Sequence, residues 1–110
     1  MRKIAANYIW LPHYPLLRGG YVLLEGDKVV RVVDTGGKLN EIAGLEFYGG
    51  LIVAACVQEL ASEWHVGDKI KPLLHAFYSR QGEINGLALI QGIDYHDFLW
   101  AKEAFVSPLR

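Results

Sequence analysis

A chain of 110 residues, of which 52% are hydrophobic, is long enough for one small folded domain and too apolar for a disordered protein. Its formal net charge of −1 excludes the strongly basic proteins that bind nucleic acid through phosphates, so we expect no nucleic-acid partner. The only cysteine, Cys56, cannot form a disulfide within the chain, which favours a reducing compartment and predicts a cytoplasmic location.

The first part of the sequence predicts short strands separated by turns. Residues 3–10 are β-prone and are followed by a proline-rich bend. The β-rich segments 21–25 and 28–34 flank Gly26-Asp27, which predicts a hairpin with a tight turn. Because valine occurs on both faces of segment 28–34, we expect this arm to be covered on both sides.

The main apolar stretch covers residues 45–57, LEFYGGLIVAACV, and separates β-rich sequence from helix-rich sequence. Its residue types predict a strand buried on both faces, and Gly49-Gly50 predicts a bulge or a change of direction. A helix is the alternative, although two adjacent glycines would cost it about 2 kcal/mol. We interpret Cys56, which lies between apolar residues, as an inert buried thiol. The apolar run 51–57 is far shorter than the about 20 residues of a membrane-spanning helix, so we expect no membrane partner.

Helical spacing follows this stretch. One or two helical turns are predicted by the apolar residues at positions 57, 60, 61 and 64. A second helix is predicted to begin near Pro72, with an apolar stripe made of Ile70, Leu73, Leu74 and Phe77.

The last part of the sequence predicts a return to strands. A turn over residues 81–86 precedes a strand over 87–91. Residues 98–104 have the propensity for a helix, whereas 105–109 predicts an edge strand that tolerates Pro108. The start of the chain shows no pattern of a secretion signal.

The titratable residues do not follow the spacing of a known site. None of the histidines lies in a cluster with metal-ligand spacing, so we expect no metal and no cofactor; they are His13, His65, His75 and His96. Polar and aromatic residues are densest at Tyr95-His96-Asp97. We interpret this cluster as a turn whose aspartate caps the backbone. The alternative is a ligand site in which the cluster meets His65 or His75 in a pocket with an aromatic wall.

Two parts of the sequence resemble the metal-dependent amidohydrolase superfamily, notably its deaminase and chlorohydrolase-like members. The first is YIWLPHYPLLRGGYVLLEGDKVVRVVD followed by GLEFYGGLIVAACV, and the second is QGEINGLALIQGIDYHDF. In that family, strands from both ends of the chain form a small β-sandwich beside a TIM barrel. The resemblance therefore implies a mainly β fold, a composite β-sandwich of N- and C-terminal strands with one or two short helices between them.

The resemblance also implies an order for the single domain, residues 1–110. N-terminal sandwich strands would occupy 1–57, a short helical bridge 58–80, and C-terminal strands 81–110. The family's N/D-A-H-x-H metal motif falls on residues 58–62, where Leu60 and Ser62 replace its two histidines. The about 250 residues of a barrel have no counterpart. The resemblance thus implies a domain without catalytic, metal or cofactor residues, and not an enzyme.

We therefore expect a non-catalytic, amidohydrolase-like interaction or scaffold module. A sandwich without its barrel keeps an apolar contact face, which predicts self-association or a protein partner. The alternative is a small-molecule binding protein or a minimal enzyme with a new site, formed by Tyr95, His96 and Asp97 together with His65 or His75.

Overall fold

The computed structural model describes residues 1–36, 42–81 and 85–109. Its elements follow one another in the order β1 (Arg2–Ile9), β2 (Leu17–Arg18), β3 (Gly20–Glu25), β4 (Lys28–Asp34), β5 (Leu45–Ala54), α1 (Val57–Ala61), α2 (Ile70–Tyr78), β6 (Leu87–Gln91) and β7 (Phe105–Leu109). Among the residues so described, no helix is long and apolar enough to span a membrane.

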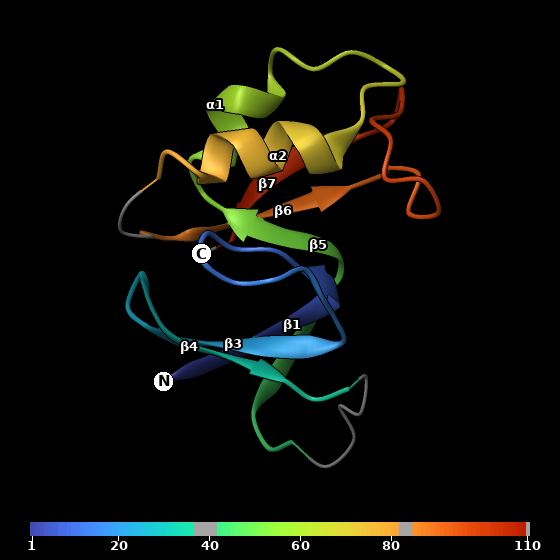
Figure 1. Cartoon of the computed structure of the whole chain (residues 1–110). Coiled ribbons are helices and arrows are strands. Elements are labelled where there is room, and N and C mark those ends of the chain that lie inside the picture. The colour runs from blue at the N-terminus through green and yellow to red at the C-terminus, as the bar shows by residue number, and fades with distance from the viewer. Residues whose placement is uncertain (37–41, 82–84, 110) are drawn as a thin grey trace.

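The strands form one mixed sheet in the order β4-β3-β1-β5-β6-β7, with β2 paired to the end of β1. β1 and β5 are parallel, and the other neighbours are antiparallel. The sheet curls, so that β1, β3, β4 and the first half of β5 form a lower layer under the second half of β5, β6 and β7, and both helices cover the upper layer (Figure 1). The predicted mainly β fold, with N- and C-terminal strands combined and short helices between them, is confirmed. Both layers belong to one continuous sheet.

Two hydrophobic cores hold these layers together. The inner core lies between the lower and upper layers and contains Ile4, Ala6, Ile9, Leu11, Val22, Leu24, Ile52, Leu87 and Leu89. The helical core lies between the upper layer and the helices and includes Leu51, Val53, Val57, Trp64, Ile70, Leu74, Tyr78, Ile90 and Phe98. Since β5 contributes to both cores, its second half is buried on both faces.

The glycine pair in β5 produces the predicted bulge. The pairing of β1 with β5 shifts register between Ala6 and Tyr8. Asn7 between them accepts a hydrogen bond through Oδ1 from the backbone N–H of Gly50, at 2.9 Å. Gly50 has a φ of 142°, and a Cβ there would lie 2.5 Å from the carbonyl oxygen of Ile90. The bulge therefore requires glycine and re-aims β5 toward β6.

Two predictions about the first half of the chain are wrong. β4 ends the sheet order and has no fully buried residue. Val30, which is 48% exposed, is the extra residue where the β3–β4 register shifts, and so it has no partner on β3. Cys56 is exposed, since β5 ends at Ala54 and the chain turns into α1 there. Partial burial nevertheless raises the pKa of the Cys56 thiol, which disfavours the reactive thiolate.

The helices follow the predicted spacing with one exception. α2 includes Pro72 in its first turn, and Ile70, Leu74 and Tyr78 are buried on the side that faces the sheet. Leu73, a member of the predicted stripe, is 36% exposed. The buried residues therefore recur at intervals of four, and Leu73 lies at the edge of the buried face.

The C-terminal part confirms two strands and decides the ambiguous segment. β6 and β7 have the predicted bounds, and Pro108 lies on the edge strand opposite Ala88. Residues 98–104 form no helix; Phe98 has a φ of 52°, and Leu99 pairs with Asp94. The predicted turn over 81–86 falls partly on residues 82–84, outside the described residues.

A contact between the hairpin and β6 brings the curled sheet close to closure. Lys28, at the start of β4, forms an antiparallel bridge with Asn85. The N–H of Gly86 donates to the carbonyl oxygen of Asp27 at 2.7 Å. The tip of the β3–β4 hairpin thus meets the segment that enters β6.

Candidate functional site

The cluster Tyr95-His96-Asp97 is a turn on the surface. Asp94 Oδ1 accepts hydrogen bonds from the backbone N–H groups of His96, at 2.9 Å, and Asp97, at 3.4 Å. The side chains of His96 and Asp97 are exposed. The Tyr95 ring stacks on Tyr8, with ring centroids 5.7 Å apart. The aspartate that caps this turn is therefore Asp94, and Tyr95 serves packing.

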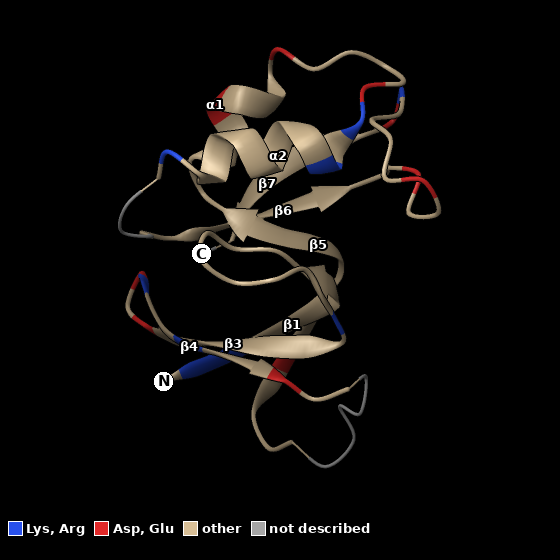
Figure 2. Cartoon of the chain, viewed as in Figure 1, with Lys and Arg blue, Asp and Glu red and all other residues tan. Residues whose placement is uncertain are grey.

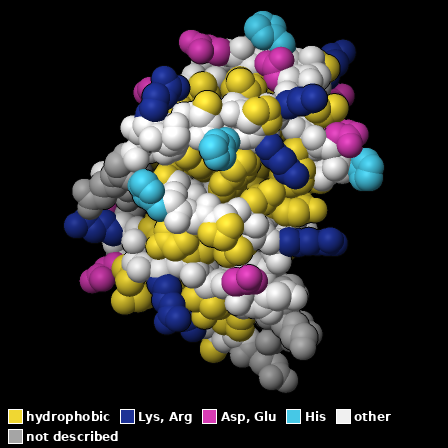
Figure 3. Space-filling view, viewed as in Figure 1, with side chains coloured by type: hydrophobic (Ala, Val, Ile, Leu, Met, Phe, Trp, Pro, Cys, Tyr) yellow, Lys and Arg dark blue, Asp and Glu magenta, His cyan; other side chains and the backbone are white. Residues whose placement is uncertain are grey.

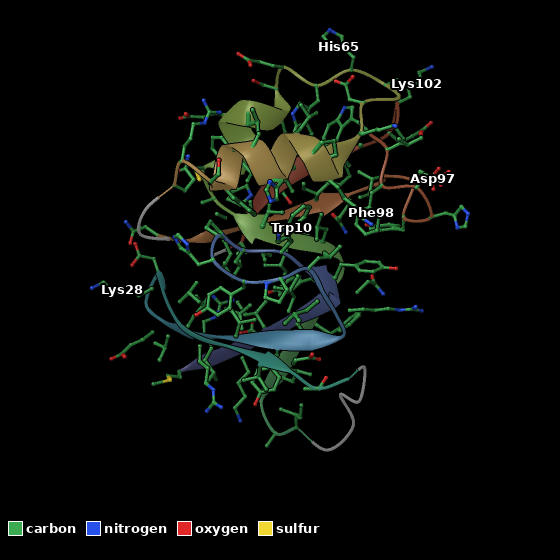
Figure 4. All side chains as sticks on the ribbon, viewed as in Figure 1. Trp10, Lys28, His65, Asp97, Phe98 and Lys102 are labelled. Atoms are coloured by element: carbon green, nitrogen blue, oxygen red, sulfur yellow. The ribbon has the colours of Figure 1, made fainter. Side chains whose placement is uncertain are left out.

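The other sequence-predicted residues do not join this cluster. His65 lies on the loop after α1 with an exposed side chain, and its backbone N–H donates to Asp68 Oδ2 at 2.7 Å. Figure 4 shows His65 and Asp97 in separate parts of the molecule. Asp97 borders one cavity, together with Lys71 and Phe98, whereas His75 borders another.

His75 borders the same cavity as His13, a histidine that the site prediction left out. A cavity of about 270 Å³ lies between α2 and the bend after β1. Its floor consists of Trp10, Leu11 and Tyr78, and its rim includes His13, Tyr14 and His75. In the view of Figure 3, histidine side chains and hydrophobic side chains lie next to each other on the face of the molecule. We call this depression the aromatic cavity.

Hydrogen bonds of Tyr78 fix the floor of the aromatic cavity. Its hydroxyl donates to the carbonyl oxygen of Trp10 at 2.7 Å and accepts from the N–H of Ala54 at 3.2 Å. The Trp10 and Tyr78 rings meet edge to face, with centroids 6.0 Å apart. Burial raises the pKa of Tyr78 far above its ordinary value, so its hydroxyl stays protonated at physiological pH.

A strained turn holds His13 at the rim. The N–H of Tyr14 donates to the carbonyl oxygen of Leu11 at 3.2 Å, which closes a turn with Pro12 and His13 at its centre. His13 has a φ of 70°, a conformation that this position of a type II turn usually gives to glycine. A non-glycine residue there costs about 1–2 kcal/mol.

A second candidate surface covers the outer side of the lower layer. Residues paired across a sheet point to the same side, so the register places two rows of side chains on it. The first row contains Val33, Tyr21, Ala5 and Phe47, and the second contains Arg31, Leu23, Lys3 and Leu45. None of these residues belongs to the inner or the helical core. We call the two rows the outer face.

The outer face leaves large apolar side chains in contact with solvent. Phe47 is 55% exposed, although Ala5 in the same row is fully buried. Tyr21 and Leu23 are half-buried beside them. Such a contiguous apolar surface is typical of a contact site for another molecule.

The two positions aligned with a metal motif have structural contacts. Leu60 packs against the helical core, and the Ser62 hydroxyl donates to the carbonyl oxygen of Glu59 at 2.7 Å. Within the described ranges, no group of three or more His, Cys, Asp or Glu side chains is placed to hold a metal ion.

Comparisons with known proteins found no matching family model, no matching curated protein and no matching solved structure. The resemblance to the amidohydrolase superfamily therefore stays a prediction from sequence.

Proposed function

We propose that this chain is a non-catalytic protein-interaction domain that binds a partner through its outer face. The observation that carries this proposal is the 55% exposure of Phe47 within a row of apolar side chains that no element covers in the part of the chain described. Contacts to such a face release ordered water from the apolar surface, at about 25 cal/mol per Å² buried. Large aromatic residues often contribute much of the binding energy of such contacts.

The charges on the outer face indicate the chemistry of the partner. The charged members of its rows, Lys3 and Arg31, are both cations. Basic residues mark the start of β1 in Figure 2; Arg2 there is paired with Glu46 at 2.9 Å and adds no net charge, so Lys3 and Arg31 carry the charge of the outer face. A second copy of the chain would bring the same two cations against them, whereas carboxylates would attract them. We therefore infer a partner surface with an apolar centre and acidic residues beside it.

The non-catalytic part of the proposal depends on Leu60 and Ser62. A packed leucine and a serine that bonds its own helix offer no imidazole for a hydrolytic metal centre. The predicted cytoplasmic location likewise stays a prediction, since it depends on the single cysteine.

Site-specific photo-crosslinking tests the proposal. A benzoylphenylalanine is introduced at Phe47 in one variant and at Phe105 in a second, and each is expressed in the cells that make the protein. Phe105 is a matched control, because it is 52% exposed but lies on the edge strand β7, outside the outer face. We expect position 47, and not position 105, to crosslink to a protein that mass spectrometry identifies.

The affinity and the association rate of the chain for that purified protein are then measured. We expect Phe47→Ala to weaken the affinity at least tenfold, Arg31→Glu to lower the association rate, and Phe105→Ala to change neither. Crosslinking of position 47 to a second copy alone would contradict the acidic partner. Equal losses for Phe47→Ala and Phe105→Ala, or no crosslinked protein at all, would contradict binding through the outer face.

A further inference from the structure

The aromatic cavity combines an apolar floor, in which the Trp10 and Tyr78 rings meet edge to face, with a rim of hydrogen-bonding side chains. The hydroxyl of Tyr78 donates a hydrogen bond to the carbonyl oxygen of Trp10, so both groups are satisfied without a ligand. The floor therefore presents mainly ring and aliphatic surface. Such a surface favours the face of a planar ring, because aromatic rings prefer stacked or edge-to-face contacts.

The rim supplies imidazole groups from two elements far apart in the sequence. His13 comes from the bend after β1, and His75 comes from α2. Each neutral imidazole offers one N–H donor, and each protonated imidazole offers two. No residue that lines the cavity carries a carboxylate. The rim therefore favours an acceptor, and above all an anionic one.

The conformation of His13 supports a role for its imidazole. The turn at this position takes glycine without strain, whereas histidine is held at a φ of 70°. The chain thus keeps a costly side chain where it borders the cavity. Strained residues of this kind concentrate at ligand sites.

A metal ion fits the cavity less well than an organic anion. A stable metal site needs three or four ligands, and the histidines supply two. The residues that the structure describes offer no cluster of three potential ligands. The cavity of about 270 Å³ is slightly smaller than the about 300–1,000 Å³ of sites for drug-sized molecules, which suits a molecule of one or two fused rings.

We propose that the aromatic cavity binds a small planar aromatic carboxylate. Its ring contacts both floor rings, stacked on one and edge to face with the other, because Trp10 and Tyr78 are nearly perpendicular. Its carboxylate accepts hydrogen bonds from His13 and His75. This site is separate from the outer face and does not depend on the proposed protein partner.

Calorimetric titration of the full chain with three probes tests this proposal. The probes are 2-naphthoate, its neutral analogue 2-naphthamide, and acetate. We expect 2-naphthoate to bind at least tenfold more tightly than the amide, and acetate not to bind measurably, because the ring and the carboxylate are both needed. In a ¹H–¹⁵N spectrum, 2-naphthoate is expected to shift the indole N–H signal of Trp10 more than those of the other tryptophans, Trp64 and Trp100.

The variants remove one imidazole at a time. His13→Gly relieves the strained backbone while it deletes the side chain, so we expect its thermal midpoint to stay or rise while 2-naphthoate binding weakens about tenfold. His75→Ala is expected to weaken binding by a similar factor. His96→Ala is the matched control, because His96 is an exposed histidine on another loop, and it should leave binding unchanged.

Three results would overturn the proposal. The first is no heat and no shift of the Trp10 signal at millimolar 2-naphthoate. The second is that 2-naphthamide binds as tightly as 2-naphthoate, which would mean that the imidazoles do not contribute to binding. The third is an equal loss for His96→Ala and His75→Ala, which would place the anion elsewhere. The thermal midpoint of each variant separates lost binding from lost folding.

Discussion

At the scale of single residues, Gly50 is a position where the fold accepts glycine alone. Its φ of 142° lies outside the range of other residues, and a Cβ would approach the carbonyl oxygen of Ile90 to 2.5 Å. The N–H of Gly50 is also held by Asn7. Backbone conformation and space therefore both require glycine.

We predict that Gly50→Ala lowers the free energy of unfolding by at least about 2 kcal/mol, because strain and overlap add. Urea denaturation measures this change. Gly26→Ala is the control, since Gly26 has a φ of 64° but nothing within 4 Å of a Cβ. It should cost only about 1 kcal/mol, the cost of the left-handed conformation. If the two variants lower the free energy of unfolding equally, the contact of the added Cβ with the carbonyl oxygen of Ile90 has no measurable effect.

Tyr78 is the second residue whose chemistry can be tested alone. Tyr78→Phe leaves the buried N–H of Ala54 and the carbonyl oxygen of Trp10 without their partner. We expect a loss of about 1–3 kcal/mol in the free energy of unfolding, measured by urea denaturation. Tyr14→Phe is the control, because Tyr14 is 37% exposed, and its loss should stay within about 0.5 kcal/mol.

The raised pKa of Tyr78 also predicts a dependence of stability on pH. A tyrosine in the unfolded chain ionises near pH 10, whereas burial keeps the folded Tyr78 protonated above that value. The protonated hydroxyl of Tyr78 therefore contributes fully to the free energy of unfolding below about pH 10. This contribution decreases as the pH rises toward the pKa of the folded state, by up to about 1.4 kcal/mol per pH unit. Denaturation of the native chain and of Tyr78→Phe between pH 9 and 11 should show this extra decrease only in the native chain.

At the scale of elements, α2 shows how one helix distinguishes two adjacent leucines. Leu74 is fully buried against the upper layer of the sheet, whereas Leu73 is 36% exposed. We predict that Leu74→Ala lowers the free energy of unfolding by about 2–5 kcal/mol through lost burial and a cavity. Leu73→Ala should cost less than about 1 kcal/mol by the same measurement. Similar losses would mean that α2 packs on a different face.

Elements specified by local signals could be predicted from the sequence. The hairpin of β3 and β4, the bulge at Gly49-Gly50, and the strand β6 follow from turn residues and from β-prone segments. The exposure of β4 could not be predicted in this way, because it depends on the place of β4 at the end of the sheet order and on the register shift at Val30. Periodicity describes a segment, and the sheet order depends on contacts between distant segments.

The candidate sites could be predicted less well for the same reason. His75 was among the predicted residues, but its neighbour in space, His13, lies on the bend after β1. The local signal at that bend was the pair of prolines with Tyr8, Trp10 and Tyr14 close by, for which we favour packing over the stacking of a ligand or partner peptide; it does not indicate that α2 faces the bend. The outer face likewise becomes visible only when the register of β1, β3, β4 and β5 is known.

At the scale of the whole molecule, the two halves of the chain share both cores. Ile52 pairs with Leu89, and the inner core contains residues of β1, β3, β5 and β6. We predict that fragments 1–57 and 58–110 are each unfolded alone and regain a dispersed ¹H–¹⁵N spectrum when mixed. A dispersed spectrum from fragment 1–57 by itself would show that the N-terminal strands are an independent unit.

The parallel pair of β1 and β5 has a consequence for how the protein is made. Ile4 finds its neighbour Glu46 only after the hairpin between them has been translated, and the inner core is still incomplete until Leu87 and Leu89 leave the ribosome. At about 5–20 residues per second, the nascent chain spends several seconds in which β1 lacks its parallel partner β5. During those seconds the apolar side of β1 that ends in the inner core is exposed to other molecules.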